Sequence, residues 1–214
     1  MALIPYTASL ILNIPLLFKG YNSLLPSMVW SIAGFFLFVI LFFIFGAPVK
    51  SYILEHELSH MLFAVLSGTK IRRVSFSRSN AYVKTDRVNL FIALAPYSLP
   101  LYTLFVILVY KIVQLLSRSI VVSHLFYLVF GMTLSFHFIA TIHYLQLDQP
   151  DMRRYGTFPS MIFIVTWAII LLALIFALMF EEVQVLFYFR MSIRDTGDLY
   201  RSIVKLVTRS VFFS

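Results

Sequence analysis

Residues 25–46 read LPSMVWSIAGFFLFVILFFIFG, a stretch of 22 residues without a single charge. A helix rises about 1.5 Å per residue, so about 20 apolar residues cross the roughly 30 Å hydrocarbon core of a bilayer. This stretch therefore predicts a membrane-spanning helix. Four further apolar runs follow it along the chain, at residues 53–66, 88–109, 120–147 and 158–180.

The composition of the whole chain agrees with that reading. Of 214 residues, 61% are hydrophobic and 12% are charged, whereas soluble domains carry about 25% charged residues. A disordered chain and an ordinary soluble enzyme are excluded. We predict an all-α polytopic membrane protein with five to six transmembrane helices, in which residues 1–214 form one membrane-embedded domain with its core at residues 48–156. Residues 2–18 either span or lie in the interface, and they lack the basic start of a signal peptide.

The net charge of +8 does not indicate a nucleic-acid partner, because the Lys and Arg residues lie between the apolar runs. Positive loops face the cytoplasm. The segment from Lys70 to Arg87 holds six basic residues and is predicted to be cytoplasmic, as is the turn with Arg153 and Arg154. The expected partner of these loops is the lipid bilayer.

Two segments have sequence patterns that differ from those of the apolar runs. Residues 74–84 alternate apolar and polar side chains on either side of Ser79 and Asn80, which predicts a short β-hairpin. The C-terminal tail, residues 183–214, spaces Tyr200, Ile203, Val204 and Val207 as an amphipathic surface helix does. A re-entrant segment at residues 183–189 would bring this basic tail to the cytoplasmic side.

The second apolar run carries the motif His56-Glu57-Leu58-Ser59-His60. Chance would produce this H-E-x-x-H pattern about 0.002 times in a chain with five His and four Glu. On a helix, His56 and His60 share a face and can bind one metal ion. Glu57 lies about 100° further round, where it can accept a proton from water at the metal as a general base. A structural metal and a polar network between helices are the alternatives.

A third ligand is expected from a carboxylate. The chain has no cysteine, so thiolate ligands are excluded, and two imidazoles with one carboxylate are a zinc donor set that leaves a fourth position open. The acidic residues on the cytoplasmic side are Asp86, Asp148 and Asp151. We favour Asp151, which follows the helix-breaking Pro150 and begins the next helix, over Asp148.

These features together resemble the site-2 protease family of intramembrane zinc metalloproteases, as a divergent member. His56, Glu57 and His60 match the family's H-E-x-x-H in type and spacing, and Asp151 follows a proline at the start of a later segment. Ala95-Pro96 and the hairpin resemble further elements of the family, so the likeness covers about half of the chain. Ser59 stands where the family usually has glycine. The resemblance implies hydrolysis of peptide bonds in membrane proteins or peptides, in a prokaryotic plasma membrane with the site toward the cytoplasm.

Two roles are expected around this site. His137 shares a helix face with Thr141, and His143 lies near that face, so we expect His137 or His143 to stabilise the oxyanion of the tetrahedral intermediate. The hairpin edge could hold an extended substrate by adding it as a further strand. The alternative function is a non-catalytic pseudoprotease or scaffold that binds membrane proteins.

Overall fold

The structure is a computed structural model of the chain, and it describes residues 3–19, 26–77, 81–116, 119–146, 149–180 and 183–212. Contacts divide the chain into two compact units. The first joins Met1–Asn22 with Gly156–Ser214, and the second is Ser23–Tyr155. All the predicted core except Gly156 therefore falls in the second unit.

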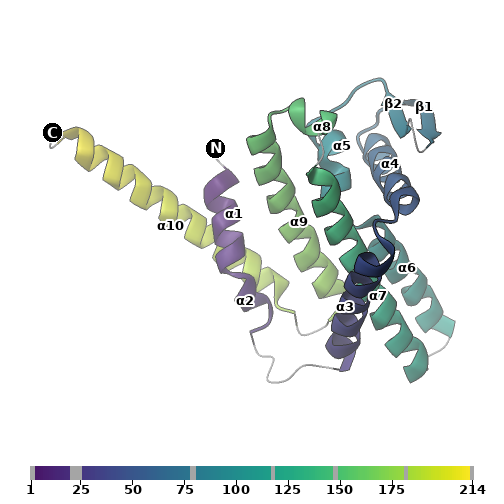
Figure 1. Cartoon of the computed structure of the whole chain (residues 1–214). Helices are drawn as coiled ribbons and strands as arrows, with labels where there is room; N and C mark the ends of the chain where they lie inside the picture. The colour runs from purple at the N-terminus through teal and green to yellow at the C-terminus, as the bar shows by residue number, and fades with distance from the viewer. Residues whose placement is uncertain are drawn as a thin grey trace. The chain divides into compact units, whose positions relative to one another are not determined.

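Two long apolar helices, α3 (Pro26–Phe45) and α7 (Ile120–Leu145), lie side by side in the second unit (Figure 1). Their backbones meet at glycines: a Cβ on Gly34 would lie 1.9 Å from the carbonyl oxygen of Leu128, and one on Gly131 would lie 1.9 Å from that of Ser31. Glycine is therefore required on both helices at this crossing, because any other residue would force the two backbones apart.

The helix with the H-E-x-x-H motif, α4 (Val49–Leu66), begins after Pro48 and ends at a glycine turn. Gly68 has φ +65° and donates its backbone N–H to Val65, while Thr69 donates to Ala64. This turn is a C-terminal glycine cap, which satisfies carbonyls that the helix itself leaves without partners.

The predicted hairpin follows α4 directly. Strands β1 (Ile71–Phe76) and β2 (Ala81–Thr85) pair antiparallel, with Val74 opposite Val83 and Phe76 opposite Ala81. The hairpin is thereby confirmed, while its predicted turn at Ser79 and Asn80 lies outside the described residues.

The third apolar run forms two helices rather than one. The short helix α5 (Leu90–Leu94) continues into a 3₁₀ turn, η1 (Ala95–Tyr97), and then α6 (Leu101–Leu116) follows at an angle of 78°. The break lies between Pro96 and Pro100, where proline lacks the N–H that a continuous helix needs. The short helix α8 (Pro150–Arg153) follows α7 and also begins at a proline.

Aromatic rings fill the space between α4 and α7. Tyr52, Phe136 and Ala140 are buried together, and the ring of Tyr52 stacks on that of Tyr144 at 3.8 Å between centroids. This cluster fixes the side of α4 that faces α7, and so determines where the motif can point.

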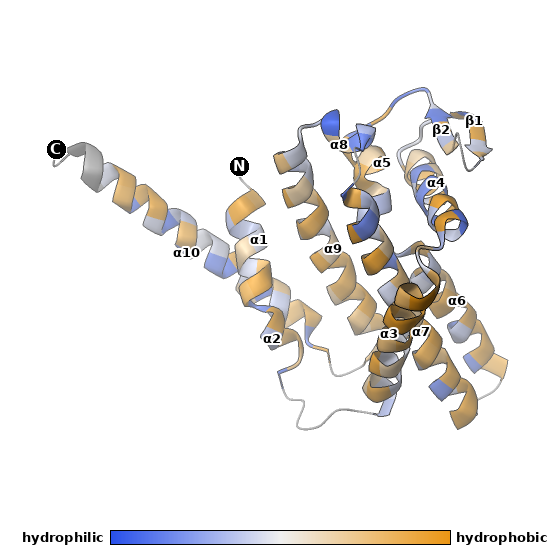
Figure 2. Cartoon of the chain, viewed as in Figure 1, coloured by the Kyte–Doolittle hydropathy of each residue, from blue (hydrophilic) through white to orange (hydrophobic). Residues whose placement is uncertain are grey.

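The first unit consists of α1 (Leu3–Leu12), α2 (Ile14–Leu17), α9 (Thr157–Met179) and α10 (Val185–Phe212). The hydroxyls of Thr7 and Thr166 lie 2.6 Å apart and join α1 to α9, and the Tyr188 hydroxyl donates to the carbonyl of Leu10. Figure 2 shows α9 apolar along its length, whereas hydrophilic and hydrophobic residues alternate through α10.

Three helices among the described residues are long and apolar enough to cross a membrane, namely α3, α7 and α9. The bent pair of α5–η1 with α6 adds a fourth if it counts as one span. Length and composition thus indicate a helical membrane protein with a small antiparallel sheet, and they show fewer spans than the five to six that we expected. The helix α4 carries Lys50, Glu55 and Glu57, and it is not among the three.

Candidate metal centre

The two histidines of the motif meet on one face of α4. Their Nε2 atoms lie 3.2 Å apart and the ring centroids 4.8 Å apart. Residues four apart on a helix lie one above the other, so the α-helical form of residues 49–66 is sufficient to bring these two nitrogens together.

Asp151 approaches the same point from α8. Its Oδ2 lies 3.6 Å from Nε2 of His56 and 3.5 Å from Nε2 of His60. The structure thus brings together His56, His60 and Asp151, which we call the His–His–Asp group, with all three donor atoms within 4.8 Å of one another. Asp148, the alternative third ligand, lies outside the described residues.

The spacing of the three donor atoms suits a small tetrahedral ion. Zinc binds imidazole nitrogen and carboxylate oxygen at about 2.0–2.2 Å, and tetrahedral angles then place neighbouring donors about 3.3 Å apart. The observed separations run from 3.2 to 3.6 Å. The group could therefore hold a metal ion with little movement, and a fourth position would remain open.

A backbone carbonyl of α5 orients the imidazole ring of His60. Nδ1 of His60 lies 2.7 Å from the carbonyl oxygen of Ile92 in α5. When Nδ1 carries the proton and donates it there, Nε2 has a free lone pair for a metal. The start of α5 is itself fixed, because the side chain of Asn89 accepts the backbone N–H of Ile92 at 2.8 Å.

Tyr97 contacts the third member of the group. Its hydroxyl lies 3.3 Å from Oδ2 of Asp151 and 3.1 Å from Oε1 of Gln149, and the side chain is buried. Its ring also meets that of His56 edge to face, at 5.3 Å between centroids. Sequence reasoning missed Tyr97, because nothing in the local pattern Ala95-Pro96-Tyr97 distinguishes its hydroxyl from those of the other tyrosines.

The group is open on the Asp151 side. The side chains of His56 and His60 are 12% and 13% exposed, and that of Asp151 is 32% exposed. Burial raises the pKa of the Asp151 carboxyl, but its contacts with His56 and His60 outweigh burial and hold the pKa well below its usual range. The partly exposed Asp151 side chain leaves the group open to water on this side.

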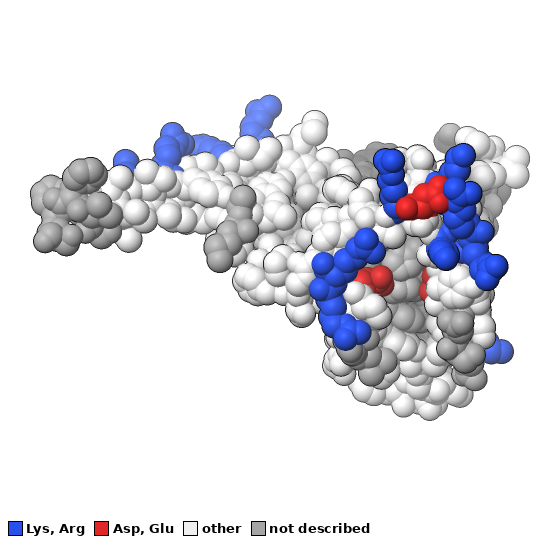
Figure 3. All heavy atoms as spheres, turned by 90° about the horizontal axis from the view of Figure 1, so that it is seen from above, with Lys and Arg blue, Asp and Glu red and all other residues white. Residues whose placement is uncertain are grey.

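Figure 3 shows Lys and Arg side chains around acidic atoms at the end of this unit. The exposed basic residues of the hairpin, of α8 and of the residues directly after them include Arg72, Arg73, Lys84, Arg87, Arg153 and Arg154. Within this cluster, Arg72 donates to Asp86 through two nitrogens and lowers the pKa of that carboxyl. Asp86 is thus engaged in the hairpin and does not join the His–His–Asp group.

Glu57 belongs to the H-E-x-x-H motif but not to the His–His–Asp group. It is 6% exposed, and no described residue offers a hydrogen bond to its Oε2. A buried carboxylate oxygen without a partner costs free energy. Glu57 follows His56 in the sequence and interacts electrostatically with His60 and Asp151, so its unpartnered oxygen is the candidate proton acceptor for water at the open fourth position.

Glu55, just before the motif, has a different position. Its Oε1 accepts the backbone N–H of Tyr102 in the first turn of α6, and its Oε2 lies 3.4 Å from Nδ1 of His137 on α7. Both side chains are buried. Glu55 therefore ties α4 to the two neighbouring helices.

The predicted oxyanion role of His137 or His143 stays a prediction. The polar partner that the structure gives His137 is Glu55, while His143 is exposed and its ring lies against Phe42. Neither side chain belongs to the His–His–Asp group.

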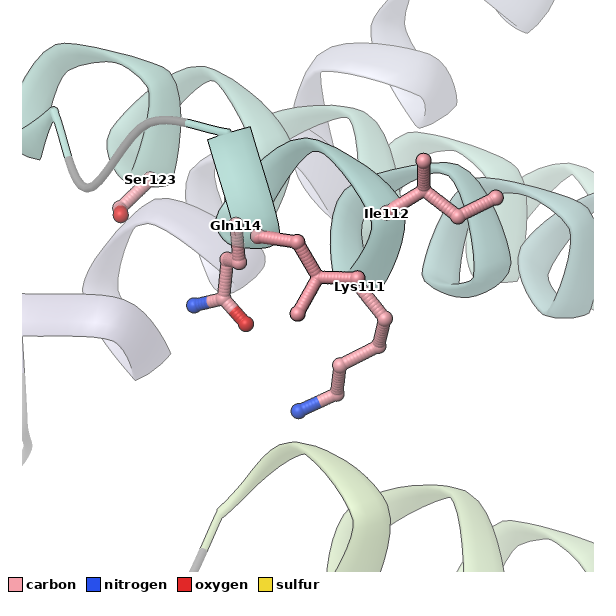
Figure 4. Close-up of a pocket in the computed structure, with 5 residues that line it drawn as sticks. Lys111, Ile112, Gln114 and Ser123 are labelled. Carbon is pink, nitrogen blue, oxygen red and sulfur yellow. The ribbon is translucent and has the colours of Figure 1, made fainter.

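A pocket lies between the end of α6 and the start of α7. Figure 4 shows it, and it has a volume of about 590 Å³. The residues that line it are Lys111, Ile112, Gln114, Leu115 and Ser123. These five residues include no His, Asp or Glu, so this pocket lacks the donor chemistry of the candidate metal centre.

The chain was also compared with known proteins. No protein-family model, no curated protein and no solved structure matches it.

Proposed function

We propose that the chain is an intramembrane zinc metalloprotease that hydrolyses peptide bonds of membrane-associated substrates. The observation that carries this proposal is the convergence of His56, His60 and Asp151 within 4.8 Å, next to a buried Glu57 whose Oε2 has no described partner. Two histidines, one carboxylate and a nearby general base are the set that zinc-dependent hydrolysis needs.

The proposed chemistry divides between the ion and the chain. A zinc ion held by the group would supply a Lewis acid that polarises water and the peptide carbonyl. Glu57 takes a proton from the attacking water while the water oxygen bonds to the carbonyl carbon. The carbon–nitrogen bond then breaks, and Glu57 returns the proton to the departing amine nitrogen.

The broken span keeps this arrangement in place. The carbonyl of Ile92 orients His60, and the hydroxyl of Tyr97 holds the oxygen of Asp151 that faces both histidines. Second contacts of this kind fix ring orientation and ligand basicity in metal sites. Irregular backbone at membrane depth is tolerated where it lines a polar cavity, which fits a break beside the group.

The proposal also covers topology and substrate. In this proposal α3, α7, α9 and the bent pair of α5–η1 with α6 cross the bilayer, while α4 stays at the end where α3 and α7 both finish. The two helices run parallel, since Trp30 stacks on His124 and the ring of Phe42 lies against that of His143. The basic hairpin and α8 then face the cytoplasm of a prokaryotic cell by the positive-inside rule. The substrate is a membrane protein or peptide whose helix must be unwound before cleavage, and the edge of the hairpin could hold the unwound segment as an added strand.

The second candidate is a pseudoprotease or scaffold that binds membrane proteins without cleaving them. Ser59 stands in place of the glycine usual in the motif of the family that the chain resembles. This change favours the alternative, because a motif that catalyses no reaction tolerates substitution. The two candidates differ in activity and not in fold, so one enzymatic experiment separates them.

The test compares Glu57→Gln with His56→Ala in the purified full chain. Fluorescein-labelled casein is a suitable probe, because an unfolded polypeptide needs no helix unwinding. We expect wild-type protein to hold about one zinc per chain and to cleave casein until a chelator removes the metal. Glu57→Gln should keep zinc and lose cleavage by at least about 100-fold, because it removes only the base, and His56→Ala should lose both.

Two results would contradict the enzyme. The first is cleavage by Glu57→Gln at the wild-type rate. The second is a wild-type protein that holds zinc and leaves casein intact, which would favour the scaffold. A wild-type protein without zinc under saturating metal would overturn the metal centre itself.

A further inference from the structure

The second half of α10 leaves an apolar helix face uncovered. Its first turns are held within their unit: Tyr188 and Ser192 are buried, and Asn13 of the α1–α2 junction donates to Asp195 at 2.9 Å. From Asp198 to Thr208 every residue is exposed. Leu206 is 72% and Ile203 46% exposed, although both are strongly apolar.

The exposed side chains are sorted by helix face. A helix turns about 100° per residue, so Leu199, Ile203 and Leu206 fall within about 60° of one another. By the same geometry, Arg194, Arg201 and Lys205 fall within about 40° on the opposite side. A helix with one apolar and one basic face lies in the interface of a membrane rather than across it.

The charges identify the kind of membrane surface. Basic residues outnumber acidic residues in this helix. The basic ones are Arg190, Arg194, Arg201, Lys205 and Arg209, and the acidic ones are Asp195 and Asp198. Of the two acids, Asp195 accepts from Asn13 and Asp198 pairs with Arg201 at 2.6 Å. The helix also follows α9, a candidate span that ends at Met179, so it begins close to a bilayer if α9 crosses one.

We propose that the second half of α10, residues 198–208, binds the surface of an anionic phospholipid leaflet. The apolar face around Ile203 and Leu206 enters the acyl boundary, and the Arg and Lys residues of the other face interact with lipid phosphates. This surface is independent of the proposed enzymatic activity, because none of its residues belongs to the His–His–Asp group.

The absence of cysteine from the sequence makes a labelling test direct. Single variants Ile203→Cys and Thr208→Cys carry a nitroxide on the apolar and the basic side of the same helix. The full chain is placed in nanodiscs of phosphatidylcholine alone or with phosphatidylglycerol. Accessibility to oxygen, which concentrates in lipid, is compared with accessibility to an aqueous nickel chelate.

We expect the label at residue 203 to be reached by oxygen and shielded from nickel in anionic nanodiscs, while the label at 208 stays open to nickel. The change Arg201→Gln with Lys205→Gln should weaken insertion on the order of tenfold or more, since each basic residue near an anionic surface contributes about 1 kcal/mol. Lys50→Gln with Lys111→Gln removes the same charge elsewhere and should have no effect on the tail.

Three outcomes would overturn the proposal. Equal nickel accessibility at both positions would place the helix in water. Spin–spin coupling between labels at residue 203 would show a second copy of the chain on this face. Shielding of residue 203 from both oxygen and nickel would show that another part of the chain covers it.

Discussion

At the scale of single residues, the candidate centre converges on Oδ2 of Asp151. This oxygen faces both histidines and also contacts the Tyr97 hydroxyl. The sequence could predict His56 and His60, because a helix turns a spacing of four into a shared face. It could favour Asp151 by its place after Pro150. The sequence could not predict the role of Tyr97, because its contact with Asp151 depends on a fold that brings residues 97 and 151 together.

Tyr97→Phe tests whether that contact matters to the centre. The variant removes one hydroxyl and keeps the ring against His56, so Asp151 loses the donor that orients it. Loss of such a contact typically lowers metal affinity by about 10- to 100-fold. We expect a fall of about tenfold in zinc affinity, measured by competition with a chromophoric chelator.

Tyr102→Phe is the matched control for this measurement. Its hydroxyl donates to the backbone of Ser51 and contacts none of the three ligands, so its zinc affinity should equal that of the wild type. The cobalt-substituted proteins provide a second readout, because a shifted ligand alters the visible spectrum. Equal affinities and identical spectra in Tyr97→Phe and Tyr102→Phe would refute the positioning role.

At the scale of helices and strands, local sequence patterns predicted which elements form better than how those elements pack and bend. The hairpin followed from alternation of apolar and polar residues, and α7 and α9 followed from apolar length. The third run was expected as one apolar run, and its 78° bend was not predicted, because the bend depends on the contacts of α5 with its neighbours. The glycine crossing of α3 and α7 was also not predicted, because a glycine in an apolar run does not show which helix it will meet.

Gly131→Ala tests that crossing. The added Cβ would lie 1.9 Å from the carbonyl oxygen of Ser31, so α3 and α7 must separate along their length. Forced overpacking of this kind costs about 1–3 kcal/mol. Gly197→Ala on α10 is the control, because its Cβ meets nothing within 4 Å, and alanine favours a helix over glycine by about 1 kcal/mol.

The measurement is the free energy of unfolding of each variant in mixed micelles with increasing denaturing detergent. We expect Gly131→Ala to unfold earlier than the wild type, and Gly197→Ala to unfold at the same point or later. A Gly131→Ala protein as stable as the wild type would show that the two helices do not approach as closely as the structure indicates.

At the scale of the whole molecule, contacts divide the chain into two compact units, and the single membrane-embedded domain expected from the sequence stays a prediction. Composition and apolar length indicate a membrane protein, but they cannot show how helices distribute between units, because that depends on side-chain contacts between distant segments. The His–His–Asp group lies wholly in the second unit and joins α4 to α8. A metal held there would therefore stabilise one unit and not the other.

This difference can be measured by hydrogen exchange of the full chain with and without zinc. A ligand that binds only the folded state stabilises it by about 2.7 kcal/mol when present at 100 times its dissociation constant. We expect zinc to slow exchange around residues 90–97, where Ile92 and Tyr97 contact the group, and around residues 149–153, which include Asp151. Exchange in α1 and α9 should be unchanged. Asp151→Asn weakens the ligand set and should remove most of the protection. Equal protection of both units by zinc, or protection that persists in Asp151→Asn, would show that the ion acts elsewhere than at the His–His–Asp group.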